Sequence, residues 1–281
     1  MEDLDLDPIL TLDLAALSKA YDYRPEPVEK RTPLGVDWGD VTEQALDEIR
    51  DQVLNQGALS QRPVHRHSPF FYVDLLTKTV ETSQGPLTLS VHVTKPTRSA
   101  RPTDVLSLSV QMSLPDQAVA NFLYNHASNT WELNHRIIEG PFRAQGLGSH
   151  VSKIAEGVIR AIAEETHQYQ EIEASVGQAD VLNFFLKQGY RIYPEDLAKY
   201  YLLQEASPDL VIVSEPGGSG RSWWVFPRSV YESKGDRVWD DPYVSDALQI
   251  RLQKTIESQV LRSTRHAAHT EVFDAMGAAA K

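Results

Sequence analysis

The sequence predicts an α+β protein in which a mostly antiparallel sheet is flanked by helices. Three observations support this fold class. Between residues 70 and 138, several segments alternate apolar with polar residues, and short turn signals separate them. An amphipathic helical pattern follows, and shorter segments of strand and helix come after it. Alternation is typical of strands with one buried face, and strands joined by short turns pair in antiparallel order.

The chain begins with an arm and a helix. Residues 1–40 mix acidic and apolar positions with Pro25, Pro27 and Pro33, which predicts an extended arm. Asp40 is expected to cap a helix that ends near Leu54. The apolar residues of this helix follow helical spacing: Val41, Ala45, Ile49 and Val53.

The predicted sheet follows the helix. Alternation is clearest in residues 87–94 and 106–114, which we expect to form two half-buried antiparallel strands. Further strands are expected at residues 73–80, 119–124 and 131–138, with a tight turn at residues 127–129 before the last one.

A helix is expected next, with an apolar stripe of Val151, Ile154, Ala155, Val158, Ile159 and Ile162. Its solvent side would carry Lys153, Glu156, Arg160 and Glu164. The pattern then predicts a strand at 172–176, a helix at 180–188 ended by Gly189, and a strand at 197–204.

The remaining residues differ in character. Residues 216–220 form a glycine-rich break, and the aromatic residues Trp223 and Trp224 follow it. A helix is expected from Val244 to about Leu261, with Leu248, Leu252, Ile256 and Val260 four residues apart, packed against the domain or against a second subunit of a homodimer. We therefore expect an arm and helix at 1–60, a central domain at 61–205 and an extension at 206–281.

Composition limits the classes of function. The 281 residues contain no cysteine, which excludes disulfides and cysteine nucleophiles. No apolar run approaches the roughly 18 residues of a membrane span, and residues 1–5 lack a secretory leader, so a cytoplasmic protein is expected. A formal charge of -12 favours cationic partners, such as amines, over nucleic acid.

The segment Arg143-Ala144-Gln145-Gly146-Leu147-Gly148 lies between the last predicted strand of the meander and the long helix. Glycines allow close backbone approach, and the beginning of a helix offers free N–H groups and a positive dipole end. The segment therefore predicts an anion-binding loop. The alternative is a tight strand-to-helix turn without a ligand.

This arrangement resembles the GNAT superfamily of acyltransferases, whose signature is Gln/Arg-x-x-Gly-x-Gly/Ala between a central strand and a long helix. Arg143, Gly146 and Gly148 stand in that register. A second motif of the family, an aromatic residue, three further residues and Gly-Phe, resembles Phe185 to Tyr190. The resemblance spans roughly residues 70 to 205.

The resemblance implies an acyl-CoA, usually acetyl-CoA, as co-substrate, and it implies no metal. Arg143 begins the motif, and the diphosphate is expected on the loop, at Ala144, Gln145, Gly146, Leu147, Gly148 and Ser149. The pantetheine arm would pair with the backbone of Arg136, Ile137 and Ile138. Asn183 is expected to face the same region.

The resemblance also implies catalytic roles. Glu132 stands eleven residues before Arg143, where some members carry a general base that deprotonates the acceptor amine. Its alternative role is an ion pair with Arg136 on the same face of the strand, and His135 is the second candidate base. The usual acid is a tyrosine, but Phe185 occupies that position, so Tyr190, Tyr193 or water would protonate the thiolate, or the protein binds CoA without catalysis.

The acceptor is expected to be an amine on a small molecule, a peptide or a protein. Two helices that usually shape the acceptor pocket have no room between Val93 and Val105, so the helix near residues 40–54 or the C-terminal extension would take over that role. The segment 65–67, with two histidines, lacks neighbouring metal ligands and predicts a solvated loop, as do His266 and His269 near the end of the chain. Packing is the expected role of Trp223 and Trp224, although Arg221 and Arg228 flank them.

Overall fold

The structure is a computed structural model that describes residues 10–23, 33–62, 68–98, 101, 103–143, 145–215, 223–240 and 244–257. The chain divides into two compact units, and each is described by itself. The sheet unit comprises the described residues of 32–172 and 255–257, and the second unit comprises those of 1–31 and 173–254. The predictions for residues 65–67, Arg221, His266, His269 and the chain's end fall outside the described residues.

The sheet unit is built on five strands that pair in chain order, each antiparallel to the next. They are β1 (Phe70–Thr82), β2 (Gly85–Pro96), β3 (Ser107–Leu114), β4 (Gln117–Ala127) and β5 (Thr130–Ile138). The turn between β4 and β5 has positive φ at Ser128 (51°) and Asn129 (69°), as a twisted two-residue hairpin requires. The predicted α+β class, antiparallel strands and turn are confirmed.

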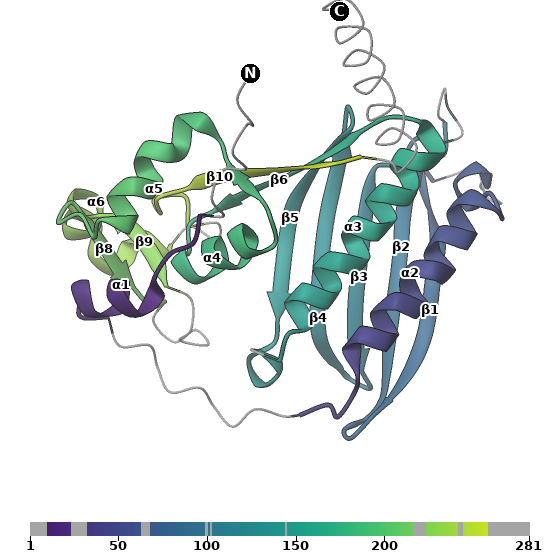
Figure 1. Ribbon diagram of the computed structural model, residues 1–281, viewed down its shortest axis with the longest axis horizontal. Helices are drawn as coiled ribbons and strands as arrows, with labels where there is room; N and C mark the ends of the chain where they lie inside the picture. The colour runs from purple at the N-terminus through teal and green to yellow at the C-terminus, as the bar shows by residue number, and fades with distance from the viewer. Residues whose placement is uncertain are drawn as a thin grey trace, which may run out of the picture. The chain divides into compact units, whose positions relative to one another are not determined.

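Each strand has one apolar and one polar face. Leu87, Leu89, Val91 and Val93 of β2 are fully buried, as are Leu108, Val110 and Met112 of β3. The helices α2 (Trp38–Leu54) and α3 (Leu147–Thr166) lie side by side over this face (Figure 1). On the opposite face, Thr88, Ser90, His92 and Thr94 of β2 are only partly buried.

Close helix packing explains two differences from the sequence prediction. A Cβ atom on Gly157 of α3 would lie 2.0 Å from Leu46 Cδ2 of α2, so a larger residue at this position would require the Leu46 side chain to move. Glu156 and Glu164, expected at the surface, are instead buried. Glu164 accepts a hydrogen bond from Arg50 Nε of α2 at 3.2 Å and forms an ion pair with the same guanidinium at 3.1 Å.

The N-cap of α2 is also different. The predicted cap, Asp40, lies inside the helix, and the Asp37 carboxylate accepts the Gly39 N–H at 2.9 Å instead. The cap is three residues earlier because Trp38 is buried as the first residue of the helix, which extends the apolar face.

The second unit consists of short elements. In chain order they are α1 (Leu14–Ala20), the end of β6 (Gln170–Val176), α4 (Ala179–Lys187), β7 (Arg191–Ile192), α5 (Leu197–Gln204), β8 (Leu210–Val213), β9 (Trp224–Pro227), α6 (Arg228–Lys234) and β10 (Ile250–Ile256). The predicted strand at 172–176 and helix at 180–188 are confirmed.

Three predictions in this unit are wrong. The expected arm contains the helix α1, which Asp13 caps through the N–H groups of Ala15 and Ala16. The expected strand at 197–204 is the helix α5, because Tyr200 and Leu203 are buried while Tyr201 and Leu202 are exposed, which is a helical spacing. The described part of the expected helix from Val244 contains β10, where buried Ile250 and Leu252 flank exposed Arg251.

The aromatic segment packs within this unit, as expected. Strands β8 and β9 pair antiparallel, and Phe226 of β9 is fully buried. Its ring centroid lies 5.3 Å from that of Trp239, and the Trp224 centroid lies 6.2 Å from Trp239. Arg228 donates hydrogen bonds to the carbonyl oxygens of Pro208 and Leu210. The rings of Trp224, Phe226 and Trp239 therefore form a small core.

None of the helices among the described residues has the length and apolar character needed to cross a membrane.

Candidate functional site

Strand β5 contains a β-bulge that changes the face of every residue after it. The register steps from Tyr124 paired with Leu133 to Leu123 paired with His135, so Asn134 has no partner on β4. Such an extra residue interrupts the alternation of side chains. The unbroken alternation predicted for residues 131–138 is therefore wrong.

The bulge separates Glu132 from Arg136. Arg136 pairs with Phe122, which is buried on the helix-covered face, and its guanidinium lies 5.7 Å from the Phe122 ring centroid. Glu132 pairs with Asn125 and is exposed. Since cross-strand partners share a face, Glu132 and Arg136 lie on opposite faces. The same-face ion pair considered as an alternative role for Glu132 does not fit this register.

Polar groups also lie between β4 and α3. The Tyr124 hydroxyl is fully buried close to Ser152 and Glu156 of α3. Burial first, and then the Glu156 carboxylate, raise the pKa of Tyr124, while Arg136 and Ser152 oppose this rise. Tyr124 therefore stays protonated at ordinary pH.

After β5 the chain forms a compact turn held by side-chain hydrogen bonds. A short 3-10 helix spans Gly140–Phe142. Arg143 Nε donates to the Ile138 carbonyl at 2.9 Å, and Gln145 Nε2 donates to the Pro141 carbonyl at 3.3 Å. These two bonds fix the loop against the end of β5. Ile137 is 38% exposed, while Ala144 lies outside the described residues.

The loop ends at Gly146, which is the N-cap of α3 in a left-handed conformation (φ 80°, ψ -6°). Its carbonyl accepts the N–H of Ser149 at 2.9 Å and of His150 at 3.3 Å. Gly146 has no side chain that could cap the helix. No described residue accepts a hydrogen bond from the N–H groups of Leu147 and Gly148, which come first in the helix, so these groups can bind solvent or a ligand. This is the geometry of an anion site at a helix N-terminus.

His150 is a loop neighbour that the sequence did not reveal. Its Nδ1 lies 2.9 Å from Thr42 Oγ1 of α2, and its ring centroid lies 6.4 Å from that of Trp38. Burial, and then the Lys153 ammonium, lower the pKa of His150, while Asp37 opposes this effect. His150 stands four residues after Gly146, a spacing that places both on one side of the first helical turn.

The second unit holds the other candidate residues. Asn183 is buried, and its Oδ1 accepts the Leu12 N–H at 3.0 Å. Tyr190 is 4% exposed, its ring centroid lies 4.9 Å from that of Phe185, and Lys254 Nζ lies 5.4 Å from its ring centroid. These contacts favour a packing role for both residues.

Tyr193, the other candidate acid, is also engaged within its own unit. Its hydroxyl donates a hydrogen bond to the Glu173 carboxylate, and the Arg251 guanidinium lies 5.1 Å from its ring centroid.

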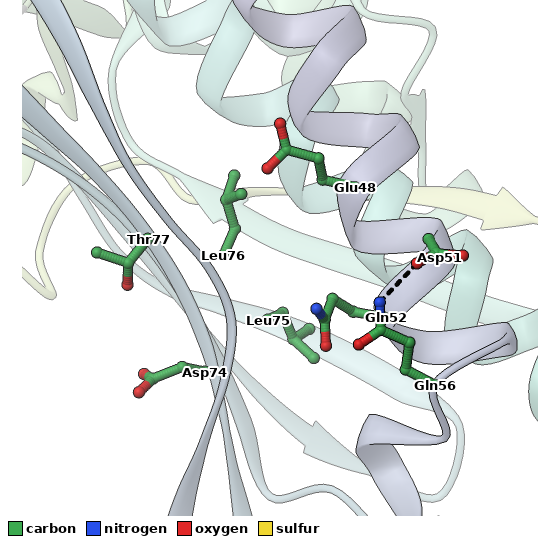
Figure 2. A pocket seen from close by; sticks show the side chains of 8 residues that line it. All are labelled: Glu48, Asp51, Gln52, Gln56, Asp74, Leu75, Leu76 and Thr77. Atoms are coloured by element: carbon green, nitrogen blue, oxygen red, sulfur yellow. Dashed lines mark hydrogen bonds between the residues drawn. The ribbon is translucent and has the colours of Figure 1, made fainter.

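A separate pocket of about 470 Å³ lies between α2 and β1 in the sheet unit (Figure 2). Leu75 and Leu76 point towards α2, whereas Asp74 and Thr77 point away from it (Figure 2). Two of its carboxylates are engaged, since Glu48 binds Lys78 at 2.6 Å and Asp51 accepts hydrogen bonds from Asn55 and Gln56, both at 2.7 Å. The remaining lining residues are Gln52 and Gln56. We assign this pocket no part in catalysis.

Within the described part of the chain, no three histidine or carboxylate side chains are grouped so that they could hold a metal ion.

Comparisons with known proteins give only distant matches. No protein-family profile matches the chain, and no curated protein gives a significant match. Among solved structures, an IAA acetyltransferase from Bacillus cereus ATCC 14579 is 13% identical, with a TM-score of 0.30 over 53% of this chain and 77% of that one. A Bacillus anthracis str. Ames protein, described as a streptothricin acetyltransferase in complex with acetyl coenzyme A, is 12% identical, with a TM-score of 0.29 over 73% of this chain and 94% of that one. TM-scores of this size do not establish a shared fold.

Proposed function

We propose that the chain binds an acyl-CoA at the junction of β5 and α3 and transfers the acyl group to an amine. The observation that carries this proposal is the N-cap Gly146, which leaves the first N–H groups of α3 without a side-chain cap. The motif Arg143-x-x-Gly146-x-Gly148 stands at this junction. A diphosphate is a ligand that such N–H groups bind well.

The loop and the strand before it would each bind a different part of the cofactor. The N–H groups of Leu147 and Gly148 would bind the diphosphate, because those of Ser149 and His150 already bond to Gly146. The backbone of residues 136–138 would take the pantetheine arm as an added strand takes a partner. The Arg143 bond to Ile138 would hold both parts of the site in register.

Glu132 is the proposed general base. It is exposed on β5, and the bulge removes it from the face that carries Arg136. Its carboxylate would take a proton from the acceptor ammonium, directly or through water. The neutral nitrogen would then attack the thioester carbonyl, and the C–S bond would break.

The departing thiolate needs a proton. Tyr190 is the candidate donor, but its burial beside Phe185 leaves the ring little freedom to move. Water is the second candidate. In both cases the proton ends on the CoA sulfur, and the acceptor gains an amide bond.

Binding is tested by the shift in unfolding free energy on addition of CoA or acetyl-CoA. A ligand at 100 times its dissociation constant should stabilise the native state by about 2.7 kcal/mol. Gly148→Trp should abolish this shift, because an indole would occupy the diphosphate space. An absent shift with the wild-type protein would contradict the proposal entirely.

Transfer is tested by following free thiol from acetyl-CoA with a broad panel of amines. Glu132→Gln should lower the rate by about 10²- to 10⁴-fold, the usual contribution of a general base. Glu81→Gln, an exposed carboxylate on β1, is the matched control and should leave the rate unchanged. CoA binding without thiol release for any acceptor would instead support a binding module that has lost catalysis.

A further inference from the structure

The side chain of His150 is held in one orientation next to the loop. Thr42 Oγ1 lies 2.6 Å from the Trp38 carbonyl and 2.9 Å from His150 Nδ1. A carbonyl only accepts, so the single hydroxyl proton of Thr42 is committed to Trp38. Thr42 must therefore accept a hydrogen bond from His150, which places a proton on Nδ1.

This arrangement determines what the other ring nitrogen can do. In neutral His150 the Nδ1–H tautomer leaves a lone pair on Nε2. Protonation converts Nε2 into a positively charged N–H donor. Among the described residues, no hydrogen bond is made to Nε2. The ring thus has one fixed nitrogen and one available nitrogen.

The available edge of the ring faces the anion loop. A Cβ atom built on Gly146 would have His150 Nε2 and Cδ2 as its nearest neighbours, both at 4.0 Å. The space beside Gly146 is thus bounded by the Nε2 edge, while the first N–H groups of α3 begin at the next residue, Leu147. An anion bound at these N–H groups would lie close to Nε2.

Two charged side chains act on the pKa of His150 in opposite directions. Lys153 on α3 disfavours the imidazolium and Asp37 at the start of α2 favours it, while the other neighbours on α2, Trp38 and Thr42, are neutral. Partial burial lowers the pKa of His150 further, so the imidazole is neutral at neutral pH in the free protein. A bound diphosphate would change this balance by adding negative charge on the Nε2 side.

We propose that His150 is a ligand residue of the acyl-CoA site, and that binding of the diphosphate loads a proton onto Nε2, which then donates to a phosphate oxygen. This inference rests on the proposed function, and it adds a residue outside the loop motif and a coupling between proton uptake and cofactor binding. The proton comes from solvent and returns there when CoA leaves. In neutral His150, the Nε2 lone pair would instead repel the lone pairs of a phosphate oxygen.

The sign of the coupling follows from linkage. The anion raises the pKa of His150 in the complex above its lowered value in the free protein, so the complex holds more protons between these two values. Affinity must then be highest below this interval and fall as the pH rises through it. A group whose pKa rises by one unit on binding changes the dissociation constant about tenfold.

The experiment measures binding of 3′-dephospho-CoA calorimetrically from about pH 5 to about pH 8, the range in which histidine titrates. This probe lacks the phosphomonoester of CoA, whose own second ionisation near pH 6 would add a pH dependence. We expect the wild-type dissociation constant to rise at least about tenfold across the range. Repetition in two buffers of different ionisation enthalpy gives the number of protons taken up.

His150→Gln is the decisive variant, because its amide retains a neutral donor near the Nε2 position and does not titrate. It should bind the probe with a nearly flat pH profile. The matched control is His167→Asn at the other end of α3, where the exposed His167 has a φ of 54° that asparagine tolerates. This control should keep the wild-type profile.

Failure of the inference and failure of the proposed function differ in outcome. If His150→Gln keeps the wild-type slope, His150 is not the coupled group, although CoA binding stands. If the wild-type protein binds neither probe nor CoA at any pH, both are contradicted. The NMR titration of the His150 Cε1–H signal, assigned by its loss in His150→Gln, should move to higher pH with the probe, and an unchanged titration would also overturn the inference.

Discussion

The β5–α3 junction and the α4–β7 segment both carry motifs of the same resemblance, yet their polar groups are engaged differently. At the junction, Gly146 leaves the first N–H groups of α3 without a cap, and His150 Nε2 has no hydrogen bond among the described residues. In the other segment, Asn183 is bound to Leu12 and Tyr190 is packed beside Phe185.

This difference teaches where a spacing motif is informative. At the junction the motif specifies a backbone conformation, because glycine adopts the positive φ of Gly146 with the least strain. In the α4–β7 segment the motif specifies only the positions of side chains, and the surrounding fold decides what those side chains contact. The first segment therefore carries the proposed binding site, and the contacts of the second favour a structural role.

The largest effect is expected from a substitution that disrupts the junction of β5 and α3. Gly146→Val should remove the whole CoA-induced stabilisation, about 2.7 kcal/mol at 100 times the dissociation constant, since valine at a φ of 80° distorts the loop. Gly189→Val is the matched control: Gly189 ends α4 with a φ of 83°, and nothing lies within 4 Å of an added Cβ atom. Both variants should lose at least about 1–2 kcal/mol of stability from strain, but Gly189→Val should keep the CoA shift. Equal loss of the shift in both would show that the junction has no special role.

The next largest effect is expected at Asp196, and it tests whether this part of the second unit has a structural role. The Asp196 carboxylate is 3% exposed and binds Arg251 N–H and Nε, each at 2.9 Å, and Lys199 at 2.9 Å. Burial alone would raise the pKa of Asp196, but the hydrogen bonds from Arg251 and Lys199 lower it to about 2. Asp196→Asn should cost about 2 to 3 kcal/mol in urea unfolding at neutral pH.

The pH dependence gives this prediction its sign. Because the folded pKa of Asp196 is lowered, its contribution is complete above the pKa of the unfolded chain, about 4, and is lost as the pH falls towards about 2. Glu195→Gln is the control, since Glu195 lies 3.6 Å from the same arginine but is 69% exposed. An equal loss in both variants, or a pH-independent loss in Asp196→Asn, would contradict the assignment.

A smaller effect is expected at Asn183. Asn183→Ala leaves the Leu12 N–H, a buried donor, without its acceptor and should cost about 1 to 2 kcal/mol of stability. The CoA shift should be unchanged. Loss of CoA affinity without loss of stability would make Asn183 a cofactor ligand and remove the contrast between the two segments.

The smallest effect is expected at Tyr190. Tyr190→Phe keeps the ring that packs beside Phe185 and removes only the hydroxyl. We expect kcat to change by less than about tenfold, whereas loss of a general acid costs about 10²- to 10⁴-fold. A decrease within that larger range, with the unfolding free energy unchanged, would identify Tyr190 as the acid.

Much of the sheet unit could be predicted because its strands alternate and its helices follow a regular apolar stripe. The bulge in β5 could not be predicted, because Asn134 fits a simple alternation over residues 131–138 as well as any polar residue does. His150 was missed because a single polar residue in the first turn of an amphipathic helix gives no signal of what it contacts. That contact comes from Thr42, more than a hundred residues earlier.

Ambiguous spacing explains the errors in the second unit. Leu248, Leu252 and Ile256 are four residues apart, which fits one face of a helix and also alternate positions of a strand. Residues 197–204 are short and mostly apolar, so their pattern also fits both structures. Pairing of β10 with β7, which decides the first case, depends on residues far apart in the sequence.

The bulge at Asn134 decides which face of the sheet carries the residues of β5 that follow it. If the same residues paired without a bulge, Arg136 would lie opposite Asn121. Arg136 would then leave the face that carries Phe122, whereas removal of Asn134 would keep these two residues paired. The extra residue is therefore absorbed within β5, and residues 136–138 lead into the loop from the same faces as they would in a strand one residue shorter.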